Sequence, residues 1–420
     1  MQGILKKLPA AIAMTLAVGS ASAAIGPGND SEGFHGYGRV GIGASSAHGP
    51  QSCFGLGGNT MKYRLGNECD AYLEGGYTHD FTKVDGVTWT GTFWANAYSP
   101  NSDFGDAKLA VAKAYVEAKG LDFLNGGAVW IGKRFSVRPD IHMLDLQYIN
   151  LNGTGVGVDQ AKIGPGNFSY GLFKDNDVNI VDPVTGKVID TSAAIRQNFV
   201  YQDLPVNTNG TIDLVGTWIK AQGDKNRHNG WQLSAFHKQD KVMGKGGNTF
   251  GVQYGVGPGT GIGIGNDRMG GSGSTLLGSD VTRTRVFDDL WIQPTENFGM
   301  EMVALGQRDK SDATGSSTWT TLGVRPVYAL SRHFKLALEL GTDRVTMPNG
   351  PTQRLTKITF APIISAGPGL FDRPELRAFI SYGKWNDAAT ASVNAANNSG
   401  PVYNNHTSGA SAGFQVETWF

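Results

Sequence analysis

Three aromatic residues of this chain share a strand face with charged or amide residues. Successive side chains of a β-strand point to opposite faces, so Tyr37 lies on the same face as Arg39. By the same alternation Tyr72 lies on the face of Glu74, and Trp419 lies with polar residues of the last predicted strand. An aromatic face contacts apolar C–H groups, and ionised side chains form strong hydrogen bonds. Such a combination suits a ligand that has both apolar and polar surface.

The motifs of common enzyme sites are missing from the sequence. The glycine cluster at residues 153–157 has neither the spacing of a dinucleotide fingerprint nor a helix after it. There is no nucleophile elbow, no Cys or His spacing typical of a metal site, and no recognisable pair of catalytic carboxylates. Lys plus Arg and Asp plus Glu both number 36, and this balance argues against a nucleic-acid partner. We expect binding chemistry, with no enzymatic activity, cofactor or metal.

The elements that must position these residues are predicted to be β-strands. Residues 334–341, 376–382 and 414–420 alternate between mostly large apolar side chains and mostly charged, polar or small ones. Gly accounts for 60 of 420 residues, about twice the ordinary usage of roughly 7%. Residues 255–278 and 388–400 read as long exposed loops. With no sustained helical period and no linker composition, the sequence predicts one all-β domain.

The N-terminal residues predict export. Lys6 and Lys7 precede an apolar stretch at residues 8–18 and a small-residue cleavage site that ends at Ala23. We expect residues 1–23 to be a cleaved signal peptide and residues 24–420 to be the mature domain. The exported chain enters an oxidising compartment, where Cys53 and Cys69 can form a disulfide or remain two free, buried thiols.

Two architectures fit an exported chain of alternating strands. After residue 18 there is no apolar run of 18 residues, so the mature chain is either soluble, as a β-sandwich, or enters a membrane as a closed β-barrel. A mean hydropathy of -0.23 is expected if half of each strand faces water inside a barrel. The last residue, Phe420, lies on the apolar face of its strand, as is common in bacterial outer-membrane barrels.

A series of motifs then identifies a family. In order, these are FHGYGRVGIG (34–43), KYRLGNEC (62–69), GKRF (132–135), RPDIHMLD (138–145), TLGVRPVY (321–328), DRP (372–374), YGKW (382–385) and VETWF (416–420). Together, over essentially the whole mature chain, they resemble the maltoporin family of outer-membrane sugar porins. The resemblance implies a homotrimer of transmembrane antiparallel β-barrels of 18 strands in the outer-membrane lipid, each with an inward-folded third loop. Maltose and maltodextrins diffuse passively through each pore of such a trimer.

The same resemblance implies the residues that bind the sugar. A sugar ring has apolar C–H faces and an equator of hydroxyls, so a selective channel needs a line of aromatic faces flanked by charged groups. The positions that match the family's aromatic slide are Tyr37, Tyr72, Phe250, Phe371 and Trp419, and Phe104 matches an aromatic that enters the neighbouring subunit's pore. For Phe250 the lipid face is the alternative, because it alternates with Val252 and Tyr254. The matching polar positions are Arg39, Arg64, Arg138 and Asp145, and strand parity alone adds Glu74.

The sequence departs from the family where the third loop narrows the pore. Gln147 stands where maltoporins have a tyrosine, and Asn150 stands where they have an acidic residue. The sucrose porins also lack that tyrosine. The resemblance places Cys53 and Cys69 on either side of the first outer loop, where a disulfide closes a ring. A general diffusion porin, an exported enzyme and a sugar-binding sandwich remain the alternatives at this point.

Overall fold

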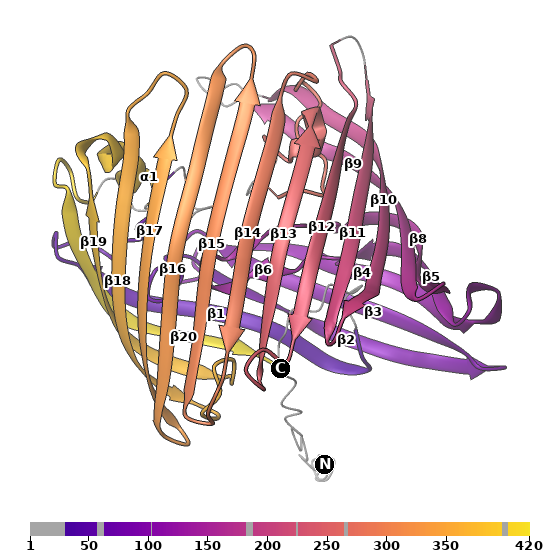
Figure 1. Cartoon of the computed structure of the whole chain (residues 1–420), viewed down its shortest axis with the longest axis horizontal. Coiled ribbons are helices and arrows are strands. Elements are labelled where there is room, and N and C mark those ends of the chain that lie inside the picture. The colour runs from indigo at the N-terminus through magenta and orange to yellow at the C-terminus, as the bar shows by residue number, and fades with distance from the viewer. Residues whose placement is uncertain are drawn as a thin grey trace, which may run out of the picture.

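A single antiparallel sheet closes on itself to form a barrel (Figure 1). The computed structural model describes residues 30–56, 63–101, 103–181, 188–223, 226–263, 268–396 and 402–420, so the predicted signal peptide lies outside the described residues. Within these ranges the sheet has 18 strands, and the first strand pairs with both the second and the last. The predicted all-β barrel of 18 strands is confirmed, and the sandwich alternative is wrong.

The barrel wall follows the chain in simple order. It begins with β1 (Gly33–Ser45), β2 (Ala71–Val84), β3 (Val87–Ser99), β4 (Lys108–Leu121), β5 (Gly127–Arg134), β8 (Gly153–Ile163), β9 (Gly166–Val181), β10 (Val188–Asn207) and β11 (Gly210–Gln222). It continues with β12 (Gly230–Asp240), β13 (Gly246–Val256), β14 (Thr282–Ile292), β15 (Phe298–Ser311), β16 (Gly315–Ser331), β17 (Phe334–Thr346), β18 (Thr352–Ser365), β19 (Glu375–Trp385) and β20 (Ser408–Trp419).

The remaining elements are short and belong to the connections. Two further strands pair only with each other, β6 (Asp140–Ile141) and β7 (Leu146–Gln147). The helical segments are η1 (Asp122–Leu124), η2 (His142–Leu144), η3 (Gly257–Thr260), η4 (Asp387–Ala389) and α1 (Thr390–Ala395). In the part of the chain that is described, no helix has the length and apolar character needed to cross a membrane.

Short turns close the end of the barrel where β1 begins and β20 ends, which we call the terminal end. The turn between β2 and β3 consists of Asp85 and Gly86, whose φ angles are 49° and 84°. Positive φ at both central residues defines a type I′ turn, which matches the twist of the flanking strands. The longer connections lie at the opposite end, which we call the loop end (Figure 1).

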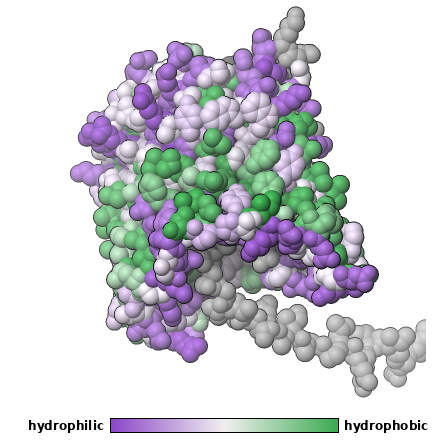
Figure 2. All heavy atoms as spheres, turned by 45° about the vertical axis from the view of Figure 1, so that its right-hand side comes forward, coloured by the Kyte–Doolittle hydropathy of each residue, from purple (hydrophilic) through white to green (hydrophobic). Residues whose placement is uncertain are grey.

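The two faces of the wall have the polarity of a membrane barrel. On β17, Leu340 is 44% exposed on the outer face, whereas its neighbour Glu339 is fully buried inside. The same alternation repeats around the wall, and Figure 2 shows apolar side chains over the middle of one outer face, with polar ones gathered above and below. A soluble protein would bury the apolar face, so this wall is built to face lipid.

The described parts of three long connections pack against the inside of the wall. We call residues 46–70 loop 1, residues 135–152 loop 3 and residues 257–281 loop 6. In loop 3 the ring of Tyr148 lies 5.0 Å from that of Phe236 on β12 and 4.6 Å from that of Phe287 on β14, centroid to centroid. Loop 6 joins loop 3 through the backbone N–H of Asn150, which donates to the carbonyl of Met269 at 2.8 Å. These loops therefore occupy part of the interior.

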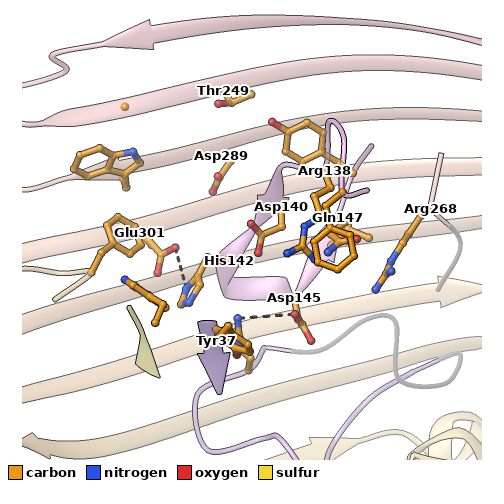
Figure 3. Close-up of a pocket in the computed structure, with 18 of the residues that line it drawn as sticks. Tyr37, Arg138, Asp140, His142, Asp145, Gln147, Thr249, Arg268, Asp289 and Glu301 are labelled. Carbon is orange, nitrogen blue, oxygen red and sulfur yellow. Dashed lines mark hydrogen bonds and ion pairs between the residues drawn. The ribbon is translucent and has the colours of Figure 1, made fainter. Parts of the chain in front are cut away.

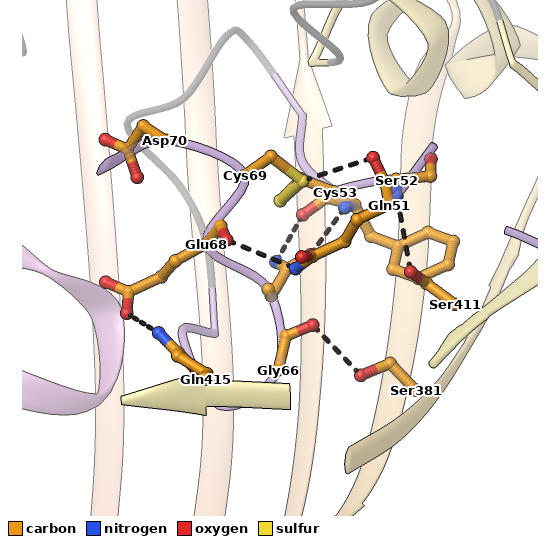
Figure 4. Close-up of a disulfide and its surroundings, with 12 residues drawn as sticks. Gln51, Ser52, Cys53, Gly66, Glu68, Cys69, Asp70, Ser381, Ser411 and Gln415 are labelled. Atoms are coloured by element: carbon orange, nitrogen blue, oxygen red, sulfur yellow. Dashed lines mark hydrogen bonds between the residues drawn. A yellow bond between two sulfur atoms is a disulfide. The ribbon is translucent and has the colours of Figure 1, made fainter. Parts of the chain in front are cut away.

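A disulfide holds loop 1 in a folded shape (Figure 4). Cys53 and Cys69 are joined, with 6.0 Å between their Cα atoms, so the predicted pairing is confirmed. Beside them, the backbone N–H of Phe54 donates to Asn67 Oδ1 at 2.7 Å, and that side chain donates back to the Phe54 carbonyl at 2.8 Å. Closing a ring of this size removes chain entropy from the unfolded state, worth about 3 kcal/mol.

Loop 1 also lies on bare backbone of the wall. A Cβ atom added to Gly323 on β16 or to Gly341 on β17 would come within 2.1 Å of the Tyr63 ring. Tyr63 can therefore reach the inner wall only where these two glycines stand, and its hydroxyl lies 2.5 Å from Thr321 Oγ1. The wall and the loop that fills it are complementary in shape.

The orientation of the faces gives a stability prediction. Leu340 lies at the middle of β17 with its side chain outward, so Leu340→Arg places a charge against lipid. We expect the free energy of unfolding from a lipid bilayer to fall by about 2–4 kcal/mol. Urea titration of the refolded protein in vesicles measures it, with Leu340→Val as the control for lost volume. Equal midpoints for the two variants would contradict the assignment of this face to lipid.

Candidate functional site

The lumen holds a cavity of about 1090 Å³. It lies between loop 3 and the inner faces of the first and last strands and of β12–β15. Most of the predicted site residues line it together, namely Tyr37, Arg39, Arg64, Tyr72, Glu74, Arg138, Asp145, Gln147, Phe371 and Trp419. Figure 3 shows several of them around the loop 3 turn. Residues far apart in the sequence thus meet in one place.

Strand register brings three of the aromatic residues together. Tyr37 on β1 pairs with Trp419 on β20, so they are neighbours across the seam of the barrel. On the other side, Arg39 pairs with Tyr72 on β2, and the rings of Tyr37 and Tyr72 lie 6.1 Å apart. A line of rings therefore runs across three adjacent strands, and all three rings face the cavity, the side that parity along the sequence predicted.

A second group of rings lies nearer the terminal end. Phe371, in the turn between β18 and β19, lies 5.5 Å from the ring of Trp291 on β14. His142 of loop 3 lies 5.9 Å from Phe371 and 6.0 Å from Trp419, with its ring edge-on to both. The two groups of aromatic rings therefore meet at His142.

Sequence reasoning missed His142 and Trp291 as lining residues. A signal for Trp291 was present, because Arg285 and Asp289 share its parity on β14 and mark that face as polar. His142 stands inside the motif RPDIHMLD, but nothing in the spacing indicated that its ring faces the lumen. On the opposite wall Lys238, Thr249 and Asp289 also line the cavity and were not predicted.

One buried carboxylate organises the seam side of the site. Glu417 Oε1 accepts a hydrogen bond from the Tyr37 hydroxyl at 3.1 Å and lies 2.8 Å from Arg64 Nη2. Glu417 Oε2 accepts from Arg373 Nε at 2.9 Å and from Arg377. Glu417 is fully buried, so these ion pairs are shielded from water and their geometry is fixed.

Loop 1 contributes its cation to this arrangement. Arg64 lies 2.8 Å from Glu68 Oε1 as well as contacting Glu417. Burial disfavours the cation, but the carboxylates of Glu68 and Glu417 outweigh it and raise the pKa of Arg64 well above its usual value. Arg64 Nη2 also donates to the Tyr37 hydroxyl at 2.6 Å. The hydroxyl of Tyr37 is thereby held between a donor and an acceptor.

A second ion-pair group fastens loop 3 to β1 and β2. Arg39 lies 2.8 Å from Asp70 and 3.4 Å from Asp145 of loop 3. Arg138, also in loop 3, lies 3.0 Å from Glu74, which accepts from the Tyr72 hydroxyl at 2.7 Å. The charged residues thus hold the rings and the constricting loop in one geometry.

Three of the predicted residues, Phe250, Phe104 and Asn150, do not line the cavity. Phe250 is 44% exposed on the outer face of β13, together with Val252 and Tyr254. The prediction that Phe250 faces the lumen is therefore wrong. Alternate residues of a strand share a face, so Phe250 faces lipid together with these apolar neighbours. Phe104 lies in the connection between β3 and β4, half-buried and away from this cavity. The predicted contact of Phe104 is with the pore of a neighbouring subunit, so it stays a prediction.

The two residues that depart from the family pattern contact each other. Asn150 Nδ2 donates to Gln147 Oε1 at 2.6 Å. Asn150 also accepts the backbone N–H of Asn152 at 3.0 Å, so its side chain stabilises loop 3. Gln147 lines the cavity directly. Loop 3 therefore presents an amide to the cavity at the position where the sequence was predicted to depart from the tyrosine of maltoporins.

A closed barrel with an apolar outside and a charged lumen that holds a cavity is the architecture of an outer-membrane porin. The chain belongs to the LamB porin family, whose model matches residues 33–420, and this membership makes it a non-enzymatic channel. The predicted family membership and outer-membrane location are confirmed.

Solved structures of other porins share the fold at low sequence identity. A BenF-like porin from Pseudomonas fluorescens Pf-5 is 11% identical, with a TM-score of 0.51, covering 92% of this chain and 98% of that chain. OccK10 (OpdN) from Pseudomonas aeruginosa is 9% identical, with a TM-score of 0.50 and the same coverage of each chain, 92% and 98%. At such low sequence identity, the similarity to these two structures shows a shared fold and nothing more.

Removing the charge of Glu417 tests its central position. Glu417→Gln leaves Arg64, Arg373 and Arg377 close together without their shared carboxylate. We expect the free energy of unfolding to fall by about 3–5 kcal/mol, the usual cost of removing one partner from a buried ion pair. Denaturant unfolding followed by tryptophan fluorescence measures it. Glu296→Gln, in the exposed turn before β15, is the control, and an equal midpoint in both variants would contradict this role of Glu417.

Proposed function

We propose that this porin is selective for sugars and mediates passive diffusion of maltose, maltodextrins or related oligosaccharides. The observation that carries the proposal is the line of rings in the lumen flanked by ionised groups. Tyr72, Tyr37 and Trp419 follow one another across β2, β1 and β20, and Phe371 continues toward the terminal end. Each ring offers an apolar face to the C–H groups of a pyranose.

The charged groups beside the rings suit the hydroxyls of the same sugar. Arg39 and Asp145 flank the line on the loop 3 side, and Glu74 lies beside Tyr72. Because these groups already bond to one another, they keep their positions without a ligand and lose little freedom when a sugar arrives. Each contact is modest, so a sugar passes from one ring to the next without a deep well that would trap it.

The amide at the constriction bears on which saccharide is preferred. Gln147 offers a donor and an acceptor but no stacking face, and the neutral Asn150 is a weaker hydroxyl acceptor than a carboxylate. We propose that the constriction is wider than in maltoporins or tuned to a different oligosaccharide. Bonding of Asn150 to Gln147 supports this, because it holds the amide of Gln147 in one orientation.

The proposal includes export and assembly. Residues 1–23 are proposed as the signal peptide that directs the chain out of the cytoplasm, and the mature chain as a homotrimer. Exposed aromatic side chains on the outer face of β2 and β3, among them Tyr77 and Phe93, suit either lipid or a neighbouring subunit. In the trimer Phe104 is proposed to reach the adjacent pore.

Single-channel recording tests the sugar-selective function. Oligosaccharide that occupies the aromatic line blocks ion current, and Trp419→Ala removes one stacking face. We expect the apparent dissociation constant for a linear maltodextrin to rise about 2- to 12-fold, corresponding to roughly 0.5–1.5 kcal/mol. The matched control is Trp218→Ala on the outer face of β11.

The outcomes separate the sugar-selective porin from a general diffusion porin. Block of the wild-type channel, weakened in Trp419→Ala and unchanged in Trp218→Ala, supports the proposal. Ion current that no oligosaccharide alters in the wild type would refute selectivity and leave a general diffusion porin.

Restoring a ring at the constriction tests the role of Gln147. Gln147→Tyr adds bulk and a stacking face where the cavity narrows, so we expect lower ion conductance and stronger block by maltodextrins than in the wild type. Block constants for maltose, sucrose and longer glucans measure the change in preference. Gln147→Glu, which keeps the side-chain shape, is the control. Unchanged conductance and unchanged order of sugars in Gln147→Tyr would show that this position does not set selectivity.

A further inference from the structure

Loop 6 brings an arginine to a fixed point in the lumen. Arg268 directly precedes Met269, whose carbonyl accepts from the backbone N–H of Asn150 at 2.8 Å and which forms a bridge with Ile149. The carbonyl of Gly270 accepts from Arg196 Nη1 on the inner wall at 3.3 Å. The backbone just after Arg268 is thus held between loop 3 and the wall.

The side chain of Arg268 is half-buried and lines the cavity. In Figure 3 it projects into the space beside Asp145 and Gln147. It lines this cavity together with Asp145, Arg138 and Tyr72.

Arg268 differs from the other cavity arginines in its bonding. Arg39, Arg64 and Arg138 each bind a carboxylate within 3.0 Å. By contrast, Arg268 makes no hydrogen bond or ion pair with any other residue in the described ranges. Burial lowers its pKa, with Asp145 acting in the opposite direction, but an arginine in a protein stays charged near neutral pH. Its five N–H donors are therefore available to something that enters the lumen.

A guanidinium that is partly withdrawn from water has a strong tendency to bind acceptors. Its planar fork donates two parallel hydrogen bonds and so matches paired oxygen atoms, such as neighbouring hydroxyls of a sugar. A neutral saccharide suits this cavity better than an acidic one, because carboxylates outnumber lysines and arginines among the described lining residues. An excess of fixed negative charge repels anions from a narrow water-filled passage.

We propose that Arg268 is a specificity-determining residue that donates hydrogen bonds to the hydroxyls of a neutral oligosaccharide on the loop side of the constriction. This inference rests on the proposed sugar-selective function. It assigns to loop 6 a binding group that complements the neutral amide of Gln147. A sugar approaching from the loop end then meets the fork of Arg268 in the same cavity as the ring of Tyr72.

Two substitutions separate the charge of Arg268 from its hydrogen-bonding shape. Arg268→Ala removes both, whereas Arg268→Lys keeps the charge and loses the planar fork. Arg332→Ala, exposed in the turn between β16 and β17, is the matched control. Heat-dependent migration on gels checks that each barrel folds. For each variant, planar-bilayer recording measures the reversal potential in a KCl gradient and the block by maltohexaose.

We expect Arg268→Ala to weaken block about 2- to 10-fold, as for loss of one hydrogen bond, and to shift the reversal potential toward greater cation selectivity. Arg268→Lys is expected to weaken block while keeping the wild-type reversal potential. The Arg332→Ala channel is expected to match the wild type in both. Wild-type block that persists unchanged in Arg268→Ala and Arg268→Lys would overturn this inference alone. A wild type that no sugar blocks would overturn the proposed function, and this inference with it.

Discussion

The buried carboxylate of Glu417 joins five parts of the molecule. It binds the Tyr37 hydroxyl of β1, Arg64 of loop 1, Arg373 of the turn after β18 and Arg377 of β19, while belonging itself to β20. The seam between the first and last strands is thereby fastened by charge as well as by backbone pairing. Because Tyr37 and Trp419 flank this carboxylate, closing the barrel and aligning the rings are one structural event.

The wall of the barrel was predictable from the sequence because its physics is local. Alternation alone places one side chain in lipid and the next in the lumen, and this put Tyr37, Tyr72 and Trp419 on the correct face. The assignment of Phe250 to the lumen was wrong because family position was preferred to parity. Its apolar neighbours Val252 and Tyr254 indicated the outer face. Parity applied to β14 would also have found Trp291.

The contents of the lumen were harder to predict because they depend on contacts between distant segments. Loop 1 reaches the wall through Tyr63 above Gly323 and Gly341, which lie more than 250 residues further along the chain. Nothing in a glycine within an alternating strand says which ring will cover it. Likewise, residues 255–278 read as an exposed loop, whereas Met269 is fully buried between loop 3 and the wall.

Tyr63 of loop 1 packs against Gly323 and Gly341 of the wall, so a loop and not the wall limits the passage there. The width of the passage is therefore set separately from the diameter of the barrel. Strand number and tilt determine the diameter of the barrel. The passage that remains for a solute is the space that loops 1, 3 and 6 leave unfilled beside the seam. An insertion or a shortened side chain in one of these loops would change the width of the passage and leave the lipid-facing wall as it is. Porins that share this architecture can therefore pass different solutes through changes in the inward-folded loops alone, with no change in the strands of the wall.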